Sequence, residues 1–103
     1  MAGNRIELWG RIPGEPELRT TPAGTSVLRM LVGADSEGDL ALAVVASGEL
    51  AQQIGPQLKA GFEVKVSGIL KAVRRGLKSG LTEVVHEVVA DSIVIGGPTG
   101  SKI

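Results

Sequence analysis

Residues 62–71 read FEVKVSGILK, and this stretch decides the fold. Phe62, Val64 and Val66 alternate with Glu63 and Lys65, and an alternation with a period of two is typical of a half-buried β-strand. Phe62 keeps phase with the two valines, so we expect it in the core. The sequence therefore predicts a strand over residues 62–71.

The segments on either side of this strand predict a helix before it and a second strand after it. Before it, Ser47 could cap a helix whose apolar residues recur at helical spacing, at Leu50, Ala51, Ile54 and Leu58. Gly55 and Pro56 interrupt that pattern, so we expect a short or broken helix. After it, residues 72–80 read AVRRGLKSG, a basic and glycine-punctuated connection. The β-branched residues 81–95 would form the strand that follows.

Three further strands are predicted in the first half of the chain, over residues 4–12, 27–34 and 40–46. Residues 13–24 contain three prolines and two glycines, which indicate a loop, and residues 35–39 indicate a polar turn. The element order is three strands, a helix and two strands. This order predicts an all-β protein, a five-stranded OB-fold barrel with a short helix between strands three and four. We assign residues 1–96 to this one domain and residues 97–103 to a disordered tail.

Composition excludes several classes of function. The chain has 103 residues, no cysteine and one histidine, so a disulfide framework and a zinc site are not expected. The longest apolar run, residues 40–46, is much shorter than the roughly 20 residues of a membrane span. We therefore expect a cytoplasmic protein that is not an enzyme and holds no cofactor or metal.

Charge is distributed unevenly along the chain, although its formal sum is 0. Residues 59–78 hold six basic side chains and one acidic side chain, a local net charge of +5. A basic cluster of this kind suits contact with nucleic-acid phosphates. Taken alone, it is more typical of a solvated charged surface.

Four segments carry a resemblance to a known family. They are NRIELWGRI (4–12), PELRTTPAGTSVLRMLV (16–32), LKAGFEVKVSGIL (58–70) and EVVADSIVIG (87–96). In this order they resemble bacterial single-stranded-DNA-binding proteins over residues 4–96. The resemblance implies an OB fold, single-stranded DNA as the ligand and a homo-oligomer, either a dimer or a tetramer.

Two departures from the family bear on the particular role. The chain has no tyrosine, one tryptophan and one phenylalanine, whereas replicative members stack bases on several aromatic rings. It also ends at Ile103 without the long acidic tail of those members. Its length, the missing tail and residues 80–86 resemble primosomal replication protein N, which acts in replication restart and suggests a restart helicase as a partner. The alternatives are a replicative binder that lacks the tail and an OB-fold protein-interaction module that does not bind nucleic acid.

Nine residues are predicted to bind DNA: Arg5, Trp9, Arg11, Arg29, Lys65, Lys71, Arg74, Arg75 and Lys78. The last four lie in or beside the connection between strands four and five, one of the loops through which OB folds bind nucleic acid. They are the predicted principal contact. The other cations fall on outward positions of the strands. Trp9 could either stack a base or lie in a dimer interface.

Overall fold

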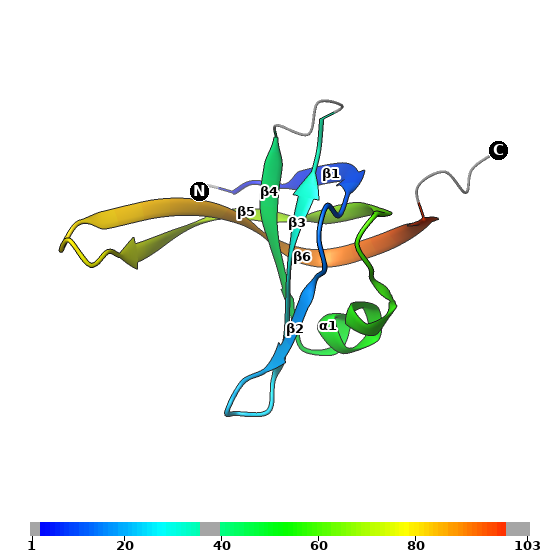
Figure 1. The fold of residues 1–103 in the computed structure, drawn as a ribbon, viewed down its shortest axis with the longest axis horizontal. Coiled ribbons are helices and arrows are strands. Elements are labelled where there is room, and N and C mark those ends of the chain that lie inside the picture. Colours follow the sequence, from blue (N-terminus) through cyan, green and yellow to red (C-terminus); the bar gives the residue numbers. More distant parts are fainter. Residues whose placement is uncertain (1–2, 36–39, 99–103) are drawn as a thin grey trace.

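The computed structural model of the chain describes residues 3–35 and 40–98 (Figure 1). Its elements are β1 (Ile6–Arg11), β2 (Glu17–Thr20), β3 (Ser26–Gly33), β4 (Ala41–Ser47), α1 (Glu49–Ile54), the 3-10 helix η1 (Gly55–Gln57), β5 (Phe62–Gly76) and β6 (Thr82–Pro98). Among the described residues, no helix is long and apolar enough to cross a membrane.

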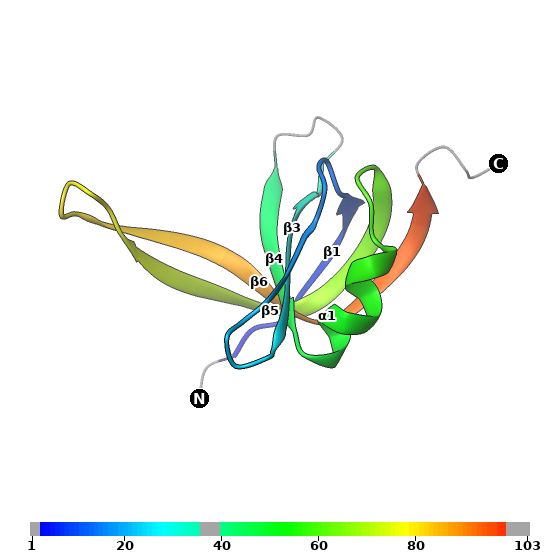
Figure 2. The same cartoon turned by 60° about the horizontal axis from the view of Figure 1, so that its bottom comes forward.

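The strands form one sheet that closes on itself. Their order is β1-β5-β6-β4-β3-β2, and a further pairing of Arg11 with Gly33 joins β1 to β3 and completes the ring. The pairings are antiparallel, except that β4 runs parallel to β6 at Ala43–Val45. The helix lies between β4 and β5 and packs on one side of the ring (Figures 1 and 2). This arrangement is the predicted OB-fold barrel.

Alternation along the strands fills the barrel with aliphatic side chains. The largest that are fully buried are Ile12, Leu28, Val32, Val44, Val66 and Val88. Burial of a side chain of this size contributes about 1.5–3 kcal/mol, so these residues are the main source of stability. Phe62 is half-buried and packs against this core, as predicted.

Two glycines allow strands to approach more closely than any side chain would permit. A Cβ atom on Gly10 would overlap the carbonyl oxygen of Gly33, at the point where β1 meets β3. A Cβ atom on Gly68 would overlap the carbonyl oxygen of Val89, at a register shift between β5 and β6. The barrel therefore closes only with glycine at these positions.

The helix is broken as predicted, but the residue that starts it is different. α1 passes into the 3-10 helix η1 at Gly55 and Pro56, since proline cannot continue an α-helix hydrogen-bond ladder. The prediction that Ser47 caps α1 is wrong: Ser47 is the last residue of β4, and Gly48 occupies the N-cap without a side-chain hydrogen bond. Gly48 has φ of 70°, a left-handed conformation that serine rarely adopts.

One strand was not predicted. Residues 17–20 form β2, which pairs with residues 26–29 of β3 at the edge of the sheet, although residues 13–24 were expected to be a loop. All four residues of β2 are exposed, so the strand has no alternation of buried and exposed side chains that the sequence could have revealed.

The strands β5 and β6 continue well beyond the barrel as a two-stranded ribbon (Figures 1 and 2). Asn4 marks the point of departure: its amide nitrogen donates to the carbonyl of Leu70 at 3.1 Å and its amide oxygen accepts from the N–H of Leu70 at 2.7 Å. Within the described chain, residues 72–86 pair only with one another, and Lys71 pairs with Glu87 where the ribbon leaves the barrel. We call residues 71–86 the arm.

The arm corrects the predicted connection between strands. Residues 72–80 were expected to be a loop, but Ala72–Gly76 belong to β5, and only Leu77–Leu81 form the turn. At its other end, β6 includes residues 97 and 98, where the tail was predicted to begin. The rest of that tail and residues 36–39 of the polar turn lie outside the described residues.

We expect Gly10→Ala to lower the free energy of unfolding by about 1–3 kcal/mol, because the added methyl group must displace backbone where the barrel closes. Gly76→Ala is the matched control, since a Cβ atom there has no other atom within 4 Å. It should leave stability unchanged or raise it by up to about 1 kcal/mol. Urea unfolding of both variants measures the difference. Equal stability of the two variants would contradict this account of closure.

Candidate nucleic-acid interface

The arm carries the densest group of cations in the chain. Lys71, Arg74 and Arg75 lie on β5 and Lys78 lies in the turn, and all four are exposed. The arm as a whole has four basic residues and one acidic residue, Glu83, a net charge of +3. The predicted principal contact is therefore an extended strand and a turn, which place the cations away from the barrel.

None of the four arm cations forms an ion pair in the described part of the chain. Their surroundings nevertheless differ. In the β5–β6 register, Lys71 stands opposite Glu87 and Arg75 stands opposite Glu83, so a carboxylate offsets part of each charge. Arg74 stands opposite Val84. Arg74 on the strand and Lys78 in the turn are thus the least compensated cations of the arm.

The cations of the barrel are mostly neutralised. Three predicted contact residues each lie near a carboxylate: Arg5 is 2.7 Å from Asp91, Arg29 is 3.5 Å from Glu87 and Lys65 is 3.9 Å from Glu7. Arg11, which is exposed and forms no ion pair among the described residues, is the exception in this predicted group. The arm is therefore better suited than the barrel wall to binding a polyanion.

The pair Arg5–Asp91 is the best-formed of these ion pairs. The guanidinium of Arg5 donates two hydrogen bonds to the carboxylate of Asp91, at 2.7 and 2.9 Å. These hydrogen bonds lower the pKa of Asp91 and raise the pKa of Arg5. Such a two-point pair fixes the direction of the guanidinium, so Arg5 would have to leave Asp91 before it could bind a phosphate.

Trp9 lies on a different part of the barrel from Arg29. It is 62% exposed on β1, and the Lys65 ammonium is 5.1 Å from the centre of its ring. In the strand register, Trp9 faces Lys65 and Lys65 faces Val94, which is 57% exposed. These three side chains form one row across β1, β5 and β6, whereas Arg29 lies on β3.

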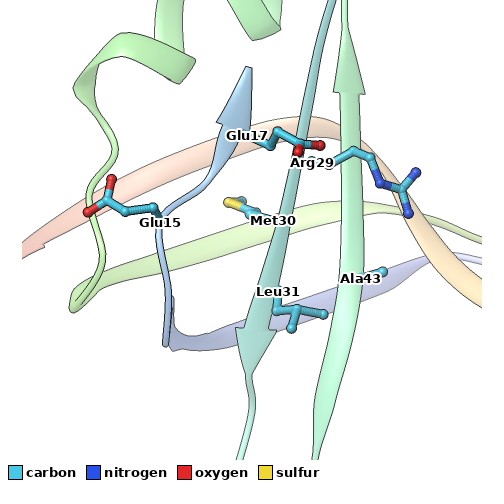
Figure 3. A pocket seen from close by; sticks show the side chains of 6 residues that line it. All are labelled: Glu15, Glu17, Arg29, Met30, Leu31 and Ala43. Atoms are coloured by element: carbon cyan, nitrogen blue, oxygen red, sulfur yellow. The ribbon is translucent and has the colours of Figure 1, made fainter. Parts of the chain in front are cut away.

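A shallow pocket of about 320 Å³ lies on the outer side of β3 (Figure 3). It is lined by Glu15, Glu17, Arg29, Met30, Leu31 and Ala43. Figure 3 shows Arg29 extending away from Glu15, in agreement with its ion pair to Glu87. Two carboxylates and no free cation line the pocket, so it is poorly suited to phosphate. Across the described residues, no three His, Cys, Asp or Glu side chains are grouped to hold a metal ion.

Comparison with known proteins identifies the family. Residues 3–95 match the Single-strand binding protein family. The chain belongs to this family. It is also similar to a single-stranded DNA-binding protein of Clostridium tetani (strain Massachusetts / E88), with 31% identity over 99 residues that cover 87% of this chain and 68% of the relative. Membership in a family of binding proteins confirms the predicted resemblance at the family level and the prediction that the chain is not an enzyme.

The sequence of this member of the single-strand binding family indicates the cations. It does not indicate the carboxylates that neutralise some of them. Glu7, Glu87 and Asp91 each lie within 4 Å of a cation from another segment of the chain. Alternation indicates that Glu7 and Glu87 point outward, but the partner across the sheet depends on register. No signal in a single sequence gives that register.

The pairing of Arg5 predicts the titration of Asp91. Because the pKa of Asp91 is lowered in the folded protein, its charge stabilises the fold above the ordinary carboxyl pKa, and this contribution is lost as the pH falls through the lowered value. In Arg5→Ala the pKa of Asp91 should rise toward its ordinary value, as measured by NMR titration of the carboxyl carbon. Arg19→Ala removes the same charge from a pair with Glu17 and should leave Asp91 unchanged. A low pKa that persists in Arg5→Ala would disprove the pairing.

Proposed function

We propose that this chain binds single-stranded DNA and that the arm is its principal contact. The observation that carries the proposal is that the four arm cations form no ion pair with any described residue, whereas most of the predicted contact cations on the barrel are paired. Cations without a competing carboxylate can bind phosphates and release the counterions condensed on DNA. The family match and the relative from Clostridium tetani support the choice of ligand.

Binding by the arm should tolerate any base sequence. Phosphate contacts carry no sequence information, and base stacking requires aromatic rings that the chain largely lacks. The outward side chains of β3 and β4 around the pocket include Leu31 and Ala43 rather than aromatic residues. Affinity should therefore be modest and mainly electrostatic.

We further propose that the chain acts in DNA replication or in replication restart, in the manner of primosomal replication protein N. The scarcity of aromatic rings and the dependence on cations favour this role over that of a replicative binder, and a restart helicase is then the expected partner. A test is the unwinding rate of such a helicase on forked DNA, which this chain should increase. The alternative of an interaction module without DNA binding predicts no affinity for oligothymidine at any salt concentration.

We also propose that the chain forms a homodimer through β1. Residues 6–10 of β1 pair with β5 on one side, and no described strand occupies the other side along this stretch. An open strand edge is a template for pairing with another chain. The exposed Trp9 and Val94 lie on the adjoining face, and large aromatic residues are enriched at subunit interfaces. This placement favours the interface over base stacking for Trp9.

Replacement of both Arg74 and Lys78 by alanine should lower the affinity for oligothymidine several-fold. It should also reduce the slope of log K against log salt by about 1.4, since each phosphate contact to a single strand contributes about 0.7. Fluorescence polarisation of a labelled oligothymidine across a salt series measures both quantities. The melting temperature should be nearly unchanged, because both side chains are exposed.

The matched control for this experiment is Arg5→Ala with Arg29→Ala. It removes the same charge from cations that are already paired with Asp91 and Glu87, so the salt slope should remain close to that of the unchanged protein. If the barrel variant loses as much affinity as the arm variant, the arm is not the principal contact.

Fluorescence of Trp9, the single tryptophan, distinguishes its two possible roles. If Trp9 lies in the dimer interface, its emission should shift to the red on dilution of the protein and should not change when oligothymidine is added at constant dimer concentration. Quenching by oligothymidine, together with emission that is independent of protein concentration, would instead place Trp9 against a base.

A further inference from the structure

The two faces of the arm differ in their chemistry. Side chains directly opposite each other on two paired strands lie on the same face of the ribbon. One face of the arm begins with Lys71 opposite Glu87, beside the barrel. Its three outer rows hold six side chains: Val73 with Val85, Arg75 with Glu83, and Leu77 with Leu81. The last row is joined by a hydrogen bond of 2.8 Å from the N–H of Leu77 to the carbonyl of Leu81. We call these six side chains the stacking face.

The stacking face is apolar at both ends and charged in the middle. Leu77 is 43% exposed and Leu81 is 68% exposed. No other described element covers the arm, which extends clear of the barrel in both views (Figures 1 and 2). A two-stranded ribbon by itself is marginally stable in water. Cover for the two apolar rows would therefore stabilise the arm.

The two side chains of the charged row form no ion pair with the part of the chain that the structure describes. Arg75 and Glu83 stand opposite each other in the register, but their side chains form no ion pair among the described residues. The stacking face therefore presents a free cation on β5 beside a free carboxylate on β6. If a second copy lies with its β5 over β6 of the first, each of these charges faces an opposite charge.

We propose that the stacking faces of two copies of this chain pack against each other around a two-fold axis parallel to the arm strands. Such an axis lays β5 of one copy over β6 of the other and keeps each row in place. Arg75 then meets the partner's Glu83, Val73 meets the partner's Val85 and Leu77 meets the partner's Leu81. One surface serves both copies, as in any two-fold interface.

The charges select this axis over the other one that brings the two faces together. A two-fold axis across the strands, through the charged row, would place Arg75 on the partner's Arg75 and Glu83 on the partner's Glu83. Like charges at close range disfavour that arrangement. The axis along the strands instead gives two attractive contacts, and since both axes place apolar rows on apolar rows, only the charges distinguish them.

The position of the barrel leaves room for this packing. Leu70 stands opposite the buried Val88, and both share their face of the ribbon with Arg74, not with Arg75. The interior of the barrel therefore lies beneath the face opposite to the stacking face. In the stacked pair the two barrels lie on the outer sides, and Arg74 remains exposed on each copy.

Charge exchange between two variants tests the proposal without DNA, so its outcome does not depend on the proposed function. Arg75→Glu alone and Glu83→Arg alone should each weaken self-association by at least about tenfold, because each places like charges across the two-fold axis. A one-to-one mixture of these two variants should restore it, since each mixed pair again has opposite charges at both contacts. Sedimentation velocity over a concentration series measures each case, and the proposed β1 contact is the same in all samples.

Two matched variants complete the design. Arg74→Glu makes the same charge change on the opposite face and should leave association unchanged. Arg75→Glu combined with Glu83→Arg in one chain should associate like the unchanged protein. Restoration in the mixture cannot come from relief of repulsion within an arm, because each single variant still has like charges opposite each other in its own arm. The proposal is overturned if Arg75→Glu associates as tightly as the unchanged protein, or if the mixture associates no more tightly than its components.

Discussion

The pairing of β5 with β6 is the interaction on which the rest of the structure depends. It runs from Phe62 opposite Pro98 to Gly76 opposite Thr82. In the first part of β5, which follows η1, Val64 and Val66 belong to the buried core. Two register shifts let the ribbon bend around the barrel, because a bulge increases the local twist and turns the strand. Past Leu70 the same hydrogen-bond ladder continues without the barrel and becomes the arm.

The length of this ladder also separates the charges. The formal net charge of the chain is 0, yet the carboxylates that form ion pairs with predicted contact residues lie on the barrel, and the four arm cations form no ion pair among the described residues. On the barrel, a cation can reach an acid two strands away, as Arg29 on β3 reaches Glu87 on β6 across β4. On the arm each strand has a single neighbour, so Arg74, opposite a valine, has no carboxylate in register. Separation of charge thus follows from the topology.

Membership in the single-strand binding family places this chain among proteins for which aromatic stacking is the expected means of holding bases. Here the outward positions of β3 and β4 at the pocket carry Arg29, Leu31 and Ala43 and no aromatic ring, and the single tryptophan lies on β1, in another part of the barrel. Under the proposed function, phosphate contacts by the arm contribute more to the affinity for DNA than base stacking on the barrel wall does. The arm then has two uses, with phosphate contact on the face of Arg74 and self-association on the face of Arg75.

The sequence by itself determined the barrel class, the broken helix and the cationic cluster at residues 71–78, because period-two alternation, the Gly55-Pro56 pair and a run of like charge are all local in the chain. The tertiary structure alone decided which cations are free. Arg5 and Asp91 are 86 positions apart, and their contact depends on a register that no local pattern encodes. For the same reason the sequence predicts loops at β2 and at the last five residues of β5, Ala72–Gly76. Both are exposed strand segments that are held in place by hydrogen bonds to a partner strand. Because neither has a buried face, no alternation of buried and exposed side chains marks them in the sequence.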